Sequence, residues 1–173
     1  MTLTMSRLTV PVFVRGLRIL STLLEKGEAH AAQAGGAPDA LLGARLADDM
    51  LPLAAQVQRA SDSAKFAAQR LSGGDAPRFA DDETTFAQLQ ARIANTIAYL
   101  ESVDPALLDA GADRPIHLDW GRARGDFSGA SYLLTIALPN FYFHVVTAYD
   151  ILRHQGVDIG KLDYLGPFGP LPA

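Results

Sequence analysis

The chain has 173 residues, of which 49% are hydrophobic and 20% are charged, a balance that suits a single globular domain with a sizeable core. Its net charge of −4, with no basic patch, argues against nucleic-acid binding, which depends on neutralising phosphates. It contains no cysteine, which excludes disulfides, thiolate metal sites and a cysteine nucleophile, and which fits a cytoplasmic protein. The longest apolar stretch, residues 132–146, is too short and too polar to span a bilayer, so we expect no membrane segment.

Two long helices are predicted in the first half of the chain. Apolar residues recur at helical spacing over residues 6–33, and a segment rich in glycine then ends the pattern. A second helical pattern covers residues 39–71. Pro52 interrupts it, which predicts either a kink or a restart of the helix with Asp48 or Asp49 as the new N-cap.

A third helix is predicted over residues 82–102, with Asp82 as its N-cap. The pattern then changes, because residues 116–120 alternate apolar and polar side chains. The next five residues, 121–125, carry glycine at both ends and are typical of a turn. This stretch therefore predicts a short β-hairpin inserted before the last helix.

The last helix is predicted over residues 128–154, with Ser128 as its N-cap, a kink at Pro139 and a stop at Gly156. The tail, residues 157–173, is expected to lack regular structure because glycine and proline are frequent in it. The predicted fold class is all-α, an up-down four-helix bundle with a short β-hairpin before the last helix, in one domain that covers residues 1–173.

Several motifs along the chain are shared with a known family. They are Thr9-Val-Pro-Val-Phe-Val-Arg-Gly-Leu17, Arg45-Leu-Ala-Asp-Asp-Met50, Ala60-Ser-Asp-Ser-Ala-Lys65, Ala137-Leu-Pro-Asn-Phe-Tyr-Phe-His144 and Ala148-Tyr-Asp-Ile-Leu-Arg-His154. By these motifs, residues 4–166 resemble the DUF1993 family of uncharacterised bacterial proteins, within the broad DinB/YfiT-like superfamily of proposed metalloenzymes. The resemblance implies a four-helix bundle with an inserted hairpin, a homodimer, and no established activity.

The resemblance also implies where a divalent metal would bind. The wider superfamily usually holds the metal with one histidine from the second helix and two histidines spaced four apart on the fourth. Matching the helix end Leu152-Arg-His-Gln-Gly156 to that of the superfamily places His144 at the last of these positions and Asn140 four residues earlier. Gln56, or otherwise Asp49, falls near the second-helix position. The chain thus departs from the three-histidine pattern at two of its three places.

A helical wheel tests whether these residues point inward. His144 lies on the apolar face of its helix, with Asn140 at the border of that face. Asp49 and Gln56 lie on one flank of the second-helix stripe, whereas Asp48 points away. A buried imidazole needs a hydrogen-bond partner, a metal or a substrate, and the pattern leaves these readings open. A helix cap for Asp49, a rim position for Gln56 and satisfaction of freed carbonyls by Asn140 stay open in the same way.

Other polar and aromatic residues are expected on the outside of the bundle. Asp62 and Lys65 are predicted to form a solvated ion pair or a dimer contact. Tyr142 and Tyr149 are predicted to mark a dimer interface or to pack on the hairpin under Trp120.

Three functions follow as alternatives. The first is a dimeric bundle with a degenerate, metal-site-like polar pocket and no assignable reaction. The second is a divergent divalent-metal-dependent enzyme, similar to relatives that use small thiols in transfer reactions. The third is a metal-free bundle that binds a small molecule between the second and fourth helices. No Walker loop, nucleophile elbow or His-Glu-x-x-His motif is present in the sequence to favour another chemistry.

Overall fold

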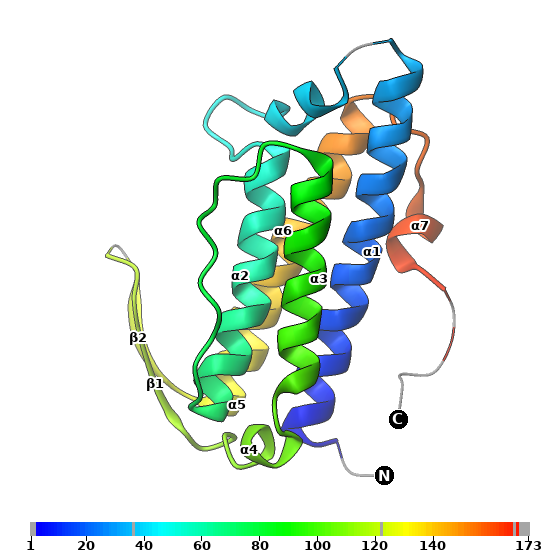
Figure 1. The fold of residues 1–173 in the computed structure, drawn as a ribbon. Helices are drawn as coiled ribbons and strands as arrows, with labels where there is room; N and C mark the ends of the chain where they lie inside the picture. The colour runs from blue at the N-terminus through cyan, green and yellow to red at the C-terminus, as the bar shows by residue number, and fades with distance from the viewer. Residues whose placement is uncertain (1–2, 36, 122, 168, 170–173) are drawn as a thin grey trace.

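Four long helices pack side by side around one apolar core in the computed structural model, which describes residues 3–35, 37–121, 123–167 and 169 (Figure 1). The fourth is a composite that we call the last bundle helix, residues 129–154. The long helices are α1 (Met5–Gln33), α2 (Leu53–Ser72), α3 (Phe86–Ser102) and the composite of α5 (Gly129–Tyr132), the π-helix η2 (Leu133–Ala137) and α6 (Leu138–His154). The predicted four-helix bundle with a hairpin before its last helix is confirmed.

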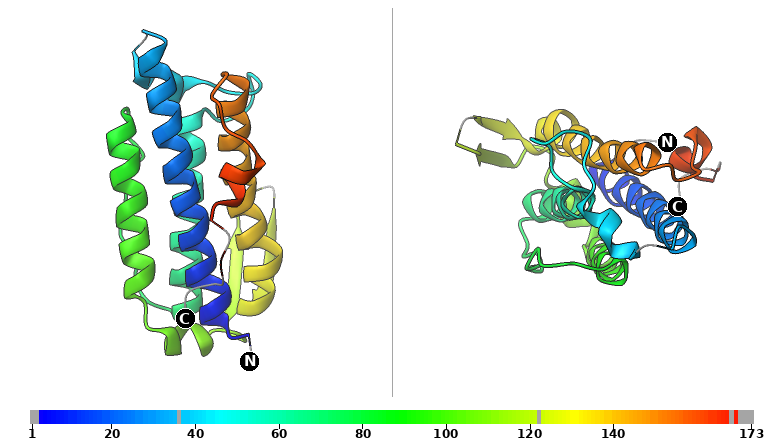
Figure 2. Two further views of the ribbon diagram at one scale, coloured as in Figure 1. Left: turned by 90° about the vertical axis from the view of Figure 1, so that its right-hand side faces the viewer. Right: turned by 90° about the horizontal axis from the view of Figure 1, so that it is seen from above.

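The helices form a square in which each has two neighbours, as the end-on view in Figure 2 shows. α1 and the last bundle helix run in one direction, and α2 and α3 both run in the other (Figure 1). Directions therefore alternate along the chain except between α2 and α3, because residues 73–85 return along the length of the bundle before α3 begins. α2 packs most extensively against α6, and this seam is the one that matters for the site.

The prediction of one long second helix over residues 39–71 is wrong in its first half. Pro38–Gly43 form a short 3-10 helix, η1, and α2 begins only at Leu53, with Pro52 as its N-cap. Proline disfavours helical geometry in the residue before it, which favours a helix boundary at this point. Asp48 and Asp49 consequently cap nothing and lie exposed in the segment that leads into α2.

α3 begins four residues later than predicted, at Phe86, and its N-cap is Thr85 in place of Asp82. The Thr85 hydroxyl accepts a hydrogen bond from the Gln88 N–H at 3.2 Å, and the Gln88 side chain accepts one from the Thr85 N–H at 3.1 Å. This reciprocal capping box satisfies two helix-end donors at once, which a lone aspartate cannot do. A short helix that the sequence did not predict, α4 (Pro105–Asp109), follows α3.

The predicted hairpin is confirmed as β1 (Pro115–Asp119) and β2 (Arg124–Ser128), which pair antiparallel. Ile116 and Leu118 are buried and fix the face that β1 turns to the bundle. Ser128 then caps the last bundle helix as predicted, accepting a hydrogen bond from the Ser131 N–H at 3.3 Å.

The interruption expected at Pro139 takes the form of the π-helix η2, which ends two residues before it. A proline removes one helix donor and crowds the carbonyl one turn earlier, and a wider turn relieves that crowding. The N–H of Leu138 accordingly bonds to the carbonyl of Leu133, five residues back.

Part of the tail is regular, contrary to prediction. α7 (Lys161–Leu165) packs beside α1, where Lys26 forms an ion pair with Asp163 at 2.5 Å. Tyr164 of α7 lies edge-on to Tyr149, with ring centroids 5.8 Å apart, so Tyr149 is covered by the tail and not by the hairpin. Residues 168 and 170–173 of the predicted tail lie outside the described residues. Among the described helices, none is both long enough and apolar enough to cross a membrane.

Candidate functional site

A pocket of about 310 Å³ lies along the seam between α2 and the last bundle helix, beside the hairpin. Its volume is at the lower end of the range for small-molecule sites, roughly 300–1,000 Å³. Its wall combines aromatic rings with charged and amide side chains. The lining residues are Arg59, Asp62, Ser63, Phe66, Arg70, Trp120, Tyr132, Ile136, Ala137, Asn140 and His144.

His144 is 9% exposed, and a hydrogen bond across the seam fixes its tautomer. Its Nδ1 lies 2.8 Å from Gln56 Oε1, and Gln56 Nε2 donates to the Leu51 carbonyl at 3.0 Å. Because a carbonyl can only accept, the Gln56 amide must present its oxygen to the histidine, and Nδ1 must carry the proton. The lone pair of Nε2 is then left as a hydrogen-bond acceptor.

Electrostatics keep the imidazole neutral. Burial, and to a smaller extent the positive charge of Arg59, lower the pKa of His144 from 6.5 to about 4. At pH 7 the ring is therefore a neutral acceptor. A positive charge close enough to lower this pKa is unfavourable to any further cation at the same place.

Asn140 forms the next bond across the seam. Its Nδ2 donates to Ser63 Oγ at 2.6 Å, and Ser63 Oγ donates to the Arg59 carbonyl at 2.7 Å. The serine hydroxyl is thus committed to a backbone carbonyl, and the amide oxygen of Asn140 remains as a second acceptor at the pocket.

Arg70 and Tyr132 form the third bond, at the end of the pocket near the hairpin. Arg70 Nη1 donates to the Tyr132 hydroxyl at 2.9 Å, and the guanidinium carbon lies 5.4 Å from the Phe66 ring centroid and 5.6 Å from that of Tyr132. The side chain is half-buried, and within the described chain no carboxylate approaches to ion-pair distance. Arg70 is therefore a partly desolvated cation without a counter-charge.

These three bonds form a line that we call the polar seam: Gln56 to His144, Ser63 to Asn140, and Arg70 to Tyr132. On α2 the three residues are seven apart, a spacing that keeps side chains within about 20° of one face. On the partner helix, Tyr132 and Asn140 are eight apart, which would separate them by about 80° in a regular helix. The π-helix between them absorbs the extra residue and brings Tyr132 onto the seam.

The four residues predicted as ligands do not all meet. His144 and Asn140 line the pocket, and Gln56 lies behind His144 as its hydrogen-bond partner. Asp49 stays outside, exposed in the segment before α2, because the helix expected to turn it inward does not form there.

The resulting donor set does not fit the divalent metal that the resemblance implies. Within the described residues no group of three or more histidine or carboxylate side chains could hold an ion. The oxygen of Gln56 is occupied by His144, and the Asp62 carboxylate of the lining is paired with Lys65 and Arg92. Of the predicted ligands, His144 Nε2 and Asn140 Oδ1 are the donors left, with the charge of Arg59 nearby. Two neutral donors beside a cation are a poor match for zinc or for magnesium.

Sequence reasoning missed Arg59, Phe66, Arg70, Tyr132 and Trp120 as pocket residues. A usable signal for Arg70 was the seven-residue spacing from Gln56 through Ser63 to Arg70, which marks one face of α2. Tyr132 gave no comparable signal, because its place on the seam depends on the π-helix.

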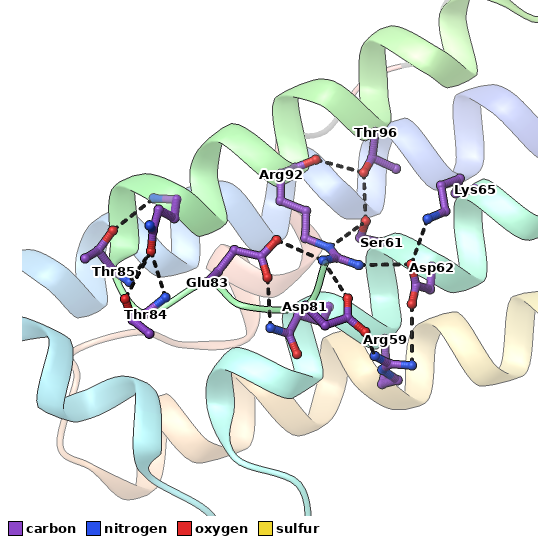
Figure 3. Close-up of polar contacts among 12 residues, drawn as sticks. Arg59, Ser61, Asp62, Lys65, Asp81, Glu83, Thr84, Thr85, Arg92 and Thr96 are labelled. Carbon is purple, nitrogen blue, oxygen red and sulfur yellow. Dashed lines mark hydrogen bonds and ion pairs between the residues drawn. The ribbon is translucent and has the colours of Figure 1, made fainter. Parts of the chain in front are cut away.

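Towards α3, α2 carries an ionic cluster, shown in Figure 3, that shares Arg59 and Asp62 with the pocket lining. At its centre is Arg92, 2% exposed, which contacts Asp62 at 2.9 Å, Asp81 at 2.7 Å and Glu83 at 2.8 Å. Asp62 also pairs with Lys65 at 3.0 Å. The outward, solvated position predicted for Lys65 is wrong, because this side chain is buried against Phe79 of the segment 73–85.

The cluster satisfies its own charges. Its members are three cations and three anions: Arg59, Lys65, Arg92, Asp62, Asp81 and Glu83. Burial raises the pKa of Glu83, but hydrogen bonds from Arg92, from its own backbone and from Gln58, together with the Arg92 charge, outweigh this and lower the pKa overall. Asp81, whose φ of 57° is unusual for a residue other than glycine, is held in place by Arg59 and Arg92.

Comparison with known proteins places this fold in a class. The crystal structure at 1.83 Å of a DinB family member protein from Shewanella denitrificans is similar, with a TM-score of 0.87 and 42% sequence identity. The match covers 97% of this chain and 94% of that one, so the bundle is DinB-like. The family model DUF1993, a domain of unknown function, matches residues 5–165, and the chain belongs to this family. A search of curated protein sequences gave no significant match.

Proposed function

We propose that this protein binds a small organic molecule in the pocket between α2 and the last bundle helix, without a metal ion as part of the site. The observation that carries the proposal is the unsatisfied polarity of the pocket. Among the residues that the structure describes, Arg70 has no counter-charge, and His144 Nε2 is a neutral acceptor. Half-buried polar groups of this kind are costly unless a partner completes their hydrogen bonds.

The apolar part of the lining supports the same proposal. Phe66, Tyr132, Trp120, Ile136 and Ala137 surround these polar groups. Small-molecule sites commonly pair a mostly apolar wall with a few fixed polar groups that set orientation.

Binding is favoured over nucleophilic catalysis at this site. The hydroxyl that lines the pocket on α2, that of Ser63, donates to the Arg59 carbonyl, so it is not activated by His144. An activated serine requires a hydrogen bond to a base, and the hydrogen bonds of Ser63 within the described residues go to the Arg59 carbonyl and to Asn140, not to His144 Nε2.

The test is ligand-observed NMR on protein treated with EDTA, using single-ring aromatic compounds that are neutral, anionic or cationic. We expect saturable binding by at least one of these classes. Ile136→Phe, which fills the pocket wall, should weaken it, whereas Leu134→Phe, an exposed position on the same π-helix, should leave it unchanged. Saturable binding by none of the classes would contradict the proposal.

We further propose that the protein is a homodimer in which the outer face of the last bundle helix forms the contact. Leu134, Phe143 and Val146 are 54%, 58% and 38% exposed apolar side chains of this helix. Light scattering after size-exclusion chromatography tests this. Phe143→Glu should convert the dimer to a monomer, and Leu162→Glu on α7, an equally apolar exposed position, should not.

A further inference from the structure

We propose that the ligand of this pocket is a monoanionic aromatic carboxylate that carries a hydroxyl at the opposite end of its ring. The inference rests on the binding function proposed above and adds the chemical class. Four features of the pocket support it, namely its charge balance, the geometry of Arg70, its aromatic wall, and the acceptors at its far end.

The charge balance of the lining favours one negative charge. Two arginines and one aspartate line the pocket. Arg59 pairs with Asp62 at 3.4 Å and with Asp81, whereas Arg70 has no carboxylate partner in the part of the chain that the structure describes. One positive charge is thus uncompensated, and a monoanion neutralises it. A dianion would carry excess negative charge beside Asp62.

The geometry at Arg70 favours a carboxylate as that anion. A guanidinium has five N–H donors in a planar fork, and Arg70 donates one hydrogen bond, to Tyr132, within the described residues. The rings of Phe66 and Tyr132 hold its plane. A fork that is held in place in this way is suited to the two oxygens of a carboxylate, which it can bind through two parallel hydrogen bonds.

The aromatic wall favours a ring attached to the carboxylate. Phe66 and Tyr132 lie against Arg70, and Trp120 also lines the pocket. A planar ligand ring gains stacking and edge-to-face contacts with them that an aliphatic acid of equal size lacks.

The far end of the pocket offers acceptors and so requires a donor from the ligand. His144 and Asn140 line this end, and neither His144 Nε2 nor Asn140 Oδ1 receives a hydrogen bond from the described residues. An ammonium group would be repelled by the Arg59 charge that already acts on His144, so a neutral donor is required, and a hydroxyl is the simplest one on a ring. Ser63 and Arg70 are seven residues, or about 10 Å, apart along α2, a length that suits one ring with a hydrogen bond at each end.

The experiment compares three probes of equal shape by NMR titration of the EDTA-treated full chain: 4-hydroxybenzoate, its neutral amide 4-hydroxybenzamide, and cationic 4-hydroxybenzylamine. We expect the carboxylate to bind about tenfold more tightly than the amide, or better still, and the amine to bind most weakly. Benzoate, without the hydroxyl, should bind about two- to tenfold more weakly than 4-hydroxybenzoate.

Variants assign the preference to Arg70. Arg70→Met should remove the advantage of the carboxylate over the amide, and Arg18→Met, which removes an exposed charge on α1, should retain it. Circular dichroism melting verifies that both variants are folded, and the probe series on the wild type tests the class without any variant. If the amide or the amine bound as tightly as the carboxylate or more tightly, the proposed ligand class would be wrong, but the proposed function of small-molecule binding would stand. Binding of none of the probes would overturn this inference. It would count against the proposed function only if the broader compound set also failed to bind.

Discussion

The two sides of α2 carry similar polar groups, but these groups are paired with one another on one side and not on the other. On the side that faces α3, Arg92 lies among three carboxylates, and the ionic cluster balances its charges (Figure 3). On the side that faces the last bundle helix, Arg70 has a tyrosine hydroxyl and two rings as partners and no carboxylate within the described chain. The charges of the ionic cluster are paired with one another, which we call the closed side. The pocket has hydrogen-bond donors and acceptors without protein partners among the described residues, and we call it the open side.

The comparison shows that burial of polar groups does not by itself mark a functional site. Arg92 and Lys65 at the centre of the cluster are each 2% exposed, yet the groups of the cluster satisfy one another and hold the segment 73–85 against α2 and α3. The pocket is the place where donors and acceptors remain unmatched. Unmatched polarity, and not burial, is the property that points to a ligand.

The largest expected effect comes from breaking the closed side. Arg92→Met leaves Asp62, Asp81 and Glu83 without their central partner, and we expect it to lower the free energy of unfolding by about 3–5 kcal/mol. Urea denaturation followed by circular dichroism measures this. Arg18→Met, whose ion pair with Glu101 is exposed, is the control and should cost less than about 1 kcal/mol. An equal loss of unfolding free energy in the two variants would contradict the interpretation that Arg92 holds the charges of the cluster together.

Lowering the pH should reduce the free energy of unfolding through His144, which lies on the open side. The unfolded pKa of 6.5 lies above the folded pKa of about 4, so the unfolded state binds more protons between these values. The stability present above pH 6.5 is therefore lost as the pH falls towards 4, by up to about 3 kcal/mol for this group. Urea titrations at pH 7 and pH 4.5 should show this loss in the wild type and a smaller loss in His144→Gln. The same pH dependence in both proteins would show that His144 is not held neutral.

Metal ions should have almost no effect on the same seam. Adding zinc, nickel or manganese to EDTA-treated protein should shift the melting temperature by less than about 1 °C, because an ion that does not bind the native state cannot stabilise it. Elemental analysis of tag-free protein should find less than about a tenth of an equivalent of transition metal. A stoichiometric ion that is lost in His144→Gln would instead make this seam a metal site.

A small effect on stability is expected from Arg70→Met. Its half-buried side chain makes one hydrogen bond, and its long apolar stem is kept by methionine, so the cost should be within about 1 kcal/mol. Urea denaturation provides the measurement. A loss as large as that of Arg92→Met would mean that Arg70 is structural, and the contrast between the two sides of α2 would disappear.

Helical spacing and apolar–polar alternation predicted the elements whose form depends on residues close together in the sequence. The inward position of His144 and Asn140 followed from helical spacing, and the hairpin followed from alternation and the glycines of its turn. The predicted inward position of Asp49 is wrong because α2 begins only after Pro52, so Asp49 lies before the helix; the pattern had left a restart at this proline open. Lys65 was misplaced for a different reason. The segment 73–85 returns along α2 and brings Phe79 onto its outward face, and periodicity within α2 carries no information about that distant segment.

The most direct test of the open seam is a crystal structure of the EDTA-treated protein soaked with 4-hydroxybenzoate. The account predicts ligand density between Phe66 and Trp120, with the carboxylate on Arg70 and the hydroxyl within hydrogen-bond distance of His144 Nε2 or Asn140 Oδ1. A pocket that stays without ligand at saturating concentration, or a carboxylate that lies away from Arg70, would contradict it.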